Sequence, residues 1–128
     1  MSVSGLGGEF ALIGMAESAV GVVPDKSPRE LCVQVTLDAI KDAGLTLAEV
    51  DGLITCNAFA EPIMYHAEAV AEYIGWQPRH CVTVNTGGGT TFMALNMAAA
   101  AIHAGMADTI VVAMGDSLRS FMTREQAM

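Results

Sequence analysis

Short apolar runs alternate with longer helical patterns along this chain. The apolar runs predict β-strands, and the last of them is a continuous run typical of a buried strand; the strands are expected at residues 10–14, 50–56, 80–85 and 109–114. Apolar positions at helical spacing predict three helices, at about 28–43, 62–74 and 90–104. This alternation predicts a βαβαβαβ arrangement, which is an α/β layer with a mostly parallel sheet. Residues 16–26 form the longest irregular stretch.

Local signals mark the ends of these helices. Ser27-Pro28-Arg29-Glu30 has the pattern of a capping box with proline at the first helical position. Gly44, Gly75 and Gly105 follow the last apolar position of each helix, where glycine commonly ends a helix.

The third predicted helix is apolar on almost every side. Between residues 91 and 103, its only polar side chain past the first turn is that of Asn96. A helix that is apolar all round is normally buried all round, and a small open sheet cannot cover it on both sides. We therefore expect residues 1–128 to be one incomplete domain, completed by more chain or by another subunit. An alanine-rich surface helix is the alternative.

Composition narrows the classes of function. Hydrophobic residues make up 52% of the 128 residues and charged residues 16%, with a formal net charge of −8. This acidic balance argues against a nucleic-acid surface, and no apolar run reaches the length of a membrane-spanning helix. Met1–Gly8 lacks the pattern of a secretory signal. The three cysteines, Cys32, Cys56 and Cys81, form neither a metal motif nor a disulfide framework, so we expect a reducing, cytoplasmic location and no metal site.

A glycine-rich segment joins the third strand to the apolar helix. It reads Val84-Asn85-Thr86-Gly87-Gly88-Gly89-Thr90-Thr91. Consecutive glycines allow close approach of a ligand, and N–H groups at a helix N-terminus attract negative charge. The segment is therefore a candidate anion or oxyanion site; a tight turn without a ligand is equally consistent. The candidate binding residues are Asn85, Gly87, Gly88, Gly89, Thr90 and Thr91, with the two threonines also expected to cap the helix.

Other reactive side chains are scattered. Cys56 ends the second strand at the edge where α/β sheets bind ligands, so it is a further candidate binding residue beside a purely structural role. Cys81 is expected to be a buried strand residue. His66 is expected to face solvent or a subunit, and His103 to suit the C-terminal end of its helix. Asp116 and Ser117 are expected to shape a loop.

Two stretches carry a family resemblance. The segment from Val84 to Gly105, followed by Ala107–Val112, resembles the strand–nucleophile–helix–strand segment of thiolases. Residues 25–31 and 42–54, above all Leu45-Thr46-Leu47-Ala48-Glu49-Val50-Asp51-Gly52, resemble the sterol-carrier, lipid-transfer-protein type of thiolase. The resemblance covers the whole chain but only about the first third of a family chain. It implies one half, still incomplete, of a layered αβαβα fold that handles acyl-CoA in lipid metabolism.

The resemblance places the family's nucleophilic cysteine at Gly88, which has no side chain to acylate. It therefore implies either an acetyl-CoA acetyltransferase-like protein without its nucleophile or a relative that cleaves acyl-CoA side chains by retro-aldol chemistry. The substrate would be a coenzyme A thioester, with no tightly bound cofactor. The partners that the resemblance implies are a second copy of this chain or a different subunit, such as one of the OB-fold, zinc-ribbon type. The remaining catalytic groups would lie in the C-terminal half.

The sequence is also consistent with two other functions. The missing nucleophile also fits a non-catalytic acyl-CoA- or lipid-binding subunit, or a scaffold for an active homologue. A nucleotide-binding α/β domain is a weaker alternative, because the glycine-rich segment matches neither a P-loop nor a dinucleotide motif.

Overall fold

A computed structural model describes residues 7–121 and 124–127. Three parallel strands form one sheet in the order β2-β1-β3, and they are β1 (Gly52–Thr55), β2 (His80–Thr83) and β3 (Ile110–Ala113). The α-helices are α1 (Pro28–Asp42), α2 (His66–Ile74), α3 (Thr90–His103), α4 (Leu118–Phe121) and α5 (Arg124–Ala127). Two short 3-10 helices, η1 (Leu47–Glu49) and η2 (Gly87–Gly89), lie in the connections.

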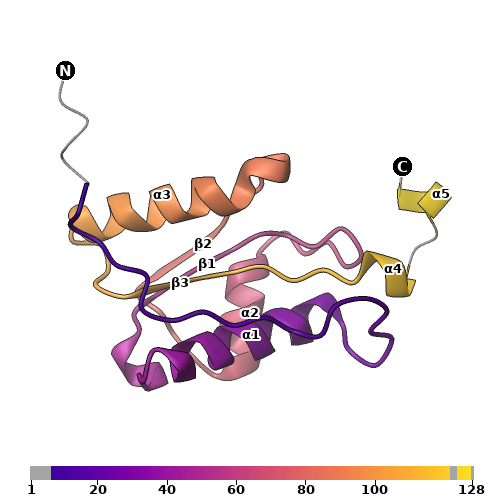
Figure 1. Ribbon diagram of the computed structural model, residues 1–128, viewed down its shortest axis with the longest axis horizontal. Helices are drawn as coiled ribbons and strands as arrows, with labels where there is room; N and C mark the ends of the chain where they lie inside the picture. The colour runs from indigo at the N-terminus through magenta and orange to yellow at the C-terminus, as the bar shows by residue number, and fades with distance from the viewer. Residues whose placement is uncertain (1–6, 122–123, 128) are drawn as a thin grey trace.

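The sheet is the middle of three layers. Helix α3 covers one face, and α1 and α2 cover the other (Figure 1). Alternation along β1 divides the core between these layers. Leu53 joins a buried cluster with α1 and α2, while Ile54 joins a second buried cluster with α3. The prediction of an α/β layer with a parallel sheet is confirmed.

The predicted boundaries of α1 are confirmed. The Ser27 side chain accepts a hydrogen bond from the Glu30 backbone N–H, and the Glu30 carboxylate accepts one from the Ser27 N–H. This reciprocal pairing satisfies donors that the first turn cannot use.

The predicted first strand is not a strand. Residues 10–14 pair with none of the three strands of the described sheet. Gly14 instead lies against α1, so closely that a Cβ there would come within 2.6 Å of the Ala39 carbonyl oxygen. The Met15 N–H donates to the Asp42 carboxylate at 2.8 Å. The segment thus runs along α1 rather than joining the sheet, and the described layer has three strands instead of four.

The second predicted helix begins later than expected, at His66 rather than near Pro62. Hydrogen bonds within residues 57–63 and to the loop after β3 hold this segment in another shape: the Asn57 side chain accepts from the Ile63 N–H, and Asp116 accepts from the N–H groups of Phe59 and Ala60. The prediction for His66 was wrong, because its side chain is fully buried.

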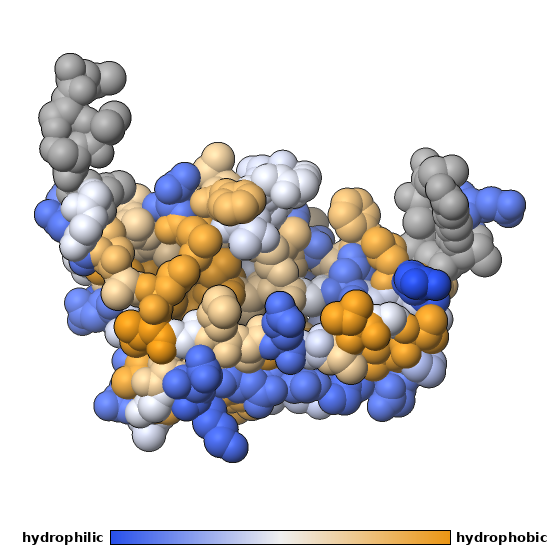
Figure 2. Space-filling view, in the orientation of Figure 1, coloured by the Kyte–Doolittle hydropathy of each residue, from blue (hydrophilic) through white to orange (hydrophobic). Residues whose placement is uncertain are grey.

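Much apolar surface remains exposed. The face of α3 toward the sheet is buried, yet Phe92 is 75% exposed on the same helix. Figure 2 shows apolar residues gathered on the face along which the N-terminal segment runs. Val20, in that segment, is 96% exposed. No helix in the described part of the chain is long and apolar enough to cross a membrane.

Candidate functional site

Residues from β1, β2 and α3 meet at the carboxyl edge of the sheet. Parallel strands bring their carboxyl ends to one edge, so Cys56 and Asn85, which follow β1 and β2, become neighbours. The Cys56 thiol lies 3.2 Å from the Asn85 side-chain oxygen, and the same oxygen accepts the Asn57 N–H at 3.0 Å. The structure therefore brings together Cys56 and Asn85, two of the residues singled out in the sequence.

The glycine-rich segment forms a tight turn into α3. Gly87 has a φ of +70°, a conformation that favours glycine. The Thr90 hydroxyl donates to the Gly87 carbonyl at 2.6 Å and accepts from the Thr86 N–H at 2.9 Å. The expected capping role of Thr90 and Thr91 is wrong: Gly89 occupies the N-cap position, and no side chain caps it. Thr90 instead braces the turn from within the first helical turn.

The space in front of Gly88 is open. A Cβ placed on Gly88 would meet no atom within 4 Å, and the same holds for Gly89. Gly88 also has no positive φ, so its backbone would accept a side chain. Because the first N–H groups of a helical turn have no acceptor within that turn, the N–H groups of Gly87 and Gly88 are suited to bind an oxyanion from this space.

Cys56 is not a ready nucleophile. Its partial burial raises the pKa of the thiol; the Thr90 side chain lowers it and the Asp116 charge raises it again, with a net increase. A raised thiol pKa keeps the uncharged form, which attacks acyl groups poorly. Cys81 lies in β2 as predicted, but it is half-buried rather than buried, because β2 is an edge strand of the described sheet. Its partial burial raises its thiol pKa to about 11. Cys32 belongs to the core.

Asp116 organises the loops at this edge. Its carboxylate accepts hydrogen bonds from the backbone N–H groups of Phe59 at 2.8 Å and Ser117 at 2.8 Å. These bonds tie the loop after β1 to the loop after β3. The structure therefore agrees with the loop-shaping role expected for Asp116.

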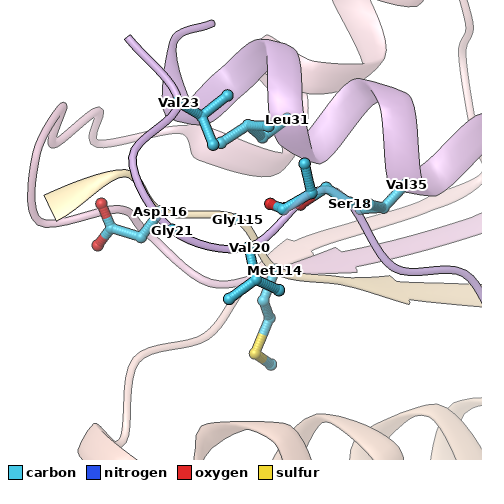
Figure 3. Close-up of a pocket in the computed structure, with 10 residues that line it drawn as sticks. Ser18, Val20, Gly21, Val23, Leu31, Val35, Met114, Gly115 and Asp116 are labelled. Atoms are coloured by element: carbon cyan, nitrogen blue, oxygen red, sulfur yellow. The ribbon is translucent and has the colours of Figure 1, made fainter. Parts of the chain in front are cut away.

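A cavity that sequence reasoning missed lies next to this edge. Its volume is about 280 Å³, and Figure 3 shows it between residues 18–23 and the first half of α1. Its lining is mixed: Val23, Leu31 and Val35 contribute apolar side chains, and Ser18 and Asp116 contribute polar ones. Met114 connects it with the glycine turn, because its sulfur lies 3.2 Å from the Thr91 hydroxyl. The irregular stretch before α1 was the only signal of this cavity in the sequence.

The site thus combines the glycine turn with a neighbouring cavity of mixed lining. The turn N–H groups are suited to donate hydrogen bonds, Asn85 and Thr90 hold the surrounding backbone in shape, and the cavity presents both polar groups and apolar side chains. Among the residues that the structure describes, no carboxylate, histidine or thiolate hydrogen-bonds to the turn. This arrangement can bind a polarised carbonyl through the turn N–H groups, but the described residues supply no activated nucleophile there.

Comparison with solved structures places the fold. The chain superimposes on the Ltp2-ChsH2(DUF35) aldolase with a TM-score of 0.64 and 29% identity, over 80% of this chain and 27% of that one. It superimposes on the SCP2-thiolase-like protein type 1 of Mycobacterium smegmatis with a TM-score of 0.60 and 20% identity, over 78% and 22% of the two chains. The chain has a thiolase-like α/β fold.

One curated relative shares sequence over most of the chain. The 17-hydroxy-3-oxo-4-pregnene-20-carboxyl-CoA lyase of Mycobacterium tuberculosis is 29% identical over 119 residues, which is 91% of this chain and 30% of that protein. The chain therefore spans less than a third of this relative's length. No family model matches the sequence.

Proposed function

We propose that this chain is the N-terminal part of a thiolase-like enzyme that cleaves a carbon–carbon bond in an acyl-CoA side chain. The observation that carries the proposal is the open space at Gly88, where a nucleophile would stand in a thiolase. Similarity to an acyl-CoA lyase over 91% of the chain supports it, as does 29% identity to the Ltp2-ChsH2(DUF35) aldolase.

The chemistry would be a retro-aldol cleavage, which requires no acyl-enzyme. A base removes the proton of a β-hydroxyl group, a carbonyl forms as the Cα–Cβ bond breaks, and a ketone or aldehyde leaves. The electron pair passes to the thioester as an enolate, which is then protonated at Cα. Developing negative charge on the thioester oxygen needs hydrogen-bond donors more than it needs a thiol.

The residues at the glycine turn would serve this oxygen. The N–H groups of Gly87 and Gly88 would donate to it, and the absent side chains at Gly88 and Gly89 would leave room for the thioester. Thr90 would hold the turn in shape through its bond to the Gly87 carbonyl. Asn85 and Cys56 would form the wall of the site beside the turn, and Thr91 would contact Met114, which also lines the cavity.

We further propose that residues 1–128 are one part of a larger domain, with the acid and base groups outside them. A further layer of structure would cover the exposed face of α3 and would supply the acid and base groups that the site needs. An additional small partner subunit is supported by the aldolase whose description pairs Ltp2 with ChsH2(DUF35).

Assays of the full-length protein test this function. It would be incubated with a β-hydroxyacyl-CoA, and separately with a β-ketoacyl-CoA plus free CoA. Release of a ketone or aldehyde from the first is expected. Thiolysis of the second without cleavage of the first would overturn the lyase proposal.

A non-catalytic acyl-CoA-binding subunit is the second candidate, and the missing nucleophile favours it. Saturable binding of the CoA thioester without turnover would support it over the lyase. The Gly88→Cys variant tests the position of the site itself: the new thiol should be acylated by a reactive thioester in the full-length protein. Failure of a folded Gly88→Cys protein to be acylated would show that the thioester lies elsewhere.

A further inference from the structure

A buried histidine, His66, lies on the opposite face of the sheet from the glycine turn and is bonded to Thr55, the neighbour of Cys56. His66 is the first residue of α2 and is 0% exposed. Its Nδ1 lies 2.9 Å from the Thr55 hydroxyl oxygen, and Thr55, the last residue of β1, is also 0% exposed. Its Nε2 is buried without a hydrogen-bond partner among the described residues. A buried polar group is costly unless it is paired, so the single bond to Thr55 is the polar interaction that fixes the ring.

A second bond secures the same helix end to the sheet. The Ala67 N–H donates to the Thr83 hydroxyl at 2.9 Å. Thr55 and Thr83 are register partners at the carboxyl ends of β1 and β2. Two neighbouring threonines of the sheet therefore hold the first two residues of α2. This arrangement fixes both ends of the loop between β1 and α2.

Cys56 follows Thr55 directly, and the pleat of a strand sends neighbouring side chains to opposite faces. Thr55 points to the layer of α1 and α2, where His66 lies, while the Cys56 thiol meets Asn85 beside the glycine turn. Rotation of the backbone at Thr55 would move Cys56 and break its contact with Asn85. The hydrogen bond between His66 and Thr55 opposes that rotation.

We propose that His66 is a positioning residue, which holds the Cys56 side chain against the glycine turn through its hydrogen bond to Thr55. It acts from behind the sheet and does not touch the substrate. The inference rests on the proposed function only because it treats Cys56 as a residue that lines the binding site. The hydrogen bonds of His66 and Cys56 do not depend on that proposal.

The test measures the reactivity of Cys56 and uses no substrate. The full-length protein is treated with iodoacetamide, and alkylation is followed at each cysteine by mass spectrometry. Thr55→Val and His66→Leu remove the hydrogen bond from its two sides. Each should speed alkylation of Cys56 about fivefold, the change expected when one hydrogen bond no longer restrains the site. Alkylation of Cys81 in β2 should change much less and reports general opening of the sheet.

Two further variants separate positioning from loss of stability. His66→Asn keeps a polar atom near the place of Nδ1 and should return Cys56 reactivity to within about twofold of the parent protein. Thr36→Val is the matched control: Thr36 is also fully buried, and its hydroxyl donates to the Cys32 carbonyl within α1 at 2.7 Å. It should leave the Cys56 rate unchanged.

Two results would overturn the proposal. One is an unchanged Cys56 rate in folded Thr55→Val; valine has nearly the shape of threonine, so this variant decides the matter even if His66→Leu does not fold. The other is an equal rise in Thr36→Val or at Cys81, which would mean general loosening. Absence of lyase turnover would refute the proposed function and leave these rates unaffected, so the two failures are distinguishable.

Discussion

The Cys56 thiol and the Asn85 side-chain oxygen lie 3.2 Å apart, although 29 residues separate them in the sequence. Asn85 accepts from the Asn57 backbone as well, so one amide oxygen ties the loop after β1 to the start of the glycine segment. This contact places a partly buried thiol beside a turn that has no side chain at Gly88. Several consequences of this geometry can be measured.

Removing the Asn85 amide should weaken the loop after β1. Asn85→Ala deletes the acceptor of two hydrogen bonds, so we expect the free energy of unfolding to fall by about 1 kcal/mol. Asn85→Asp keeps an acceptor oxygen and should lose less. Asn96→Ala is the control, since that side chain on the exposed surface of α3 has no hydrogen-bond partner in the described part of the chain. Urea denaturation measures all three, and equal effects of Asn85→Ala and Asn96→Ala would contradict the prediction.

Neighbouring glycines of the turn should respond differently to a methyl group. Gly88→Ala adds a Cβ in open space at an ordinary φ, so the free energy of unfolding should change by no more than about 0.5 kcal/mol. Gly87→Ala forces alanine into a φ of +70°, which should cost about 1–2 kcal/mol. Chemical denaturation of the two variants decides this. A larger loss for Gly88→Ala would mean that the backbone, rather than the ligand, requires glycine there.

Stability should fall in mild acid because of His66. Burial lowers the pKa of its imidazole; Glu61 and Asp116 act to raise it and Arg29 acts to lower it. The folded imidazole therefore stays neutral at a pH where the unfolded one, with a pKa of about 6.5, takes up a proton. Stability from this group is present above the unfolded pKa and is lost as the pH falls from there toward the folded pKa.

Urea midpoints at pH 7.5 and 5.5 measure this loss. The parent protein should have the lower midpoint at pH 5.5, and His66→Asn should reduce the difference between the two pH values. If His66→Asn shows the same pH dependence as the parent protein, another group is responsible.

The 128-residue chain by itself should self-associate. Leu12, Val20 and Phe92 are each at least 75% exposed, and large exposed apolar side chains in such number are typical of surfaces that another chain covers. Sedimentation velocity should show a concentration-dependent increase in mass. Replacing Val20 and Phe92 by serine should reduce it. A single monomeric species at every concentration would contradict the expectation of a covering layer.

The local sequence predicted correctly those features that depend on residues close together in the chain. The capping box at Ser27 and the glycine after each predicted helix correctly indicated where α1 begins and where the three helices end. The hydrogen bonds at helix ends span only three or four residues, so a short stretch of sequence contains the whole signal. Apolar periodicity also predicted the α/β alternation. The sequence correctly placed the glycine turn between a strand and the apolar helix. That Gly88 stands where a thiolase has its nucleophile stays a prediction from the sequence resemblance.

Tertiary structure decided what depends on distant partners. Residues 10–14 have the composition of a strand, but contacts with Ala39 and Asp42 hold their neighbours along α1. His66 looks like a surface residue of an amphipathic helix, and only the fold brings Thr55 to its ring. The contact between Cys56 and Asn85 and the cavity beside Met114 likewise depend on residues that are far apart in the sequence. A sequence pattern fixes local backbone conformation, whereas burial and pairing depend on which segments the fold brings together.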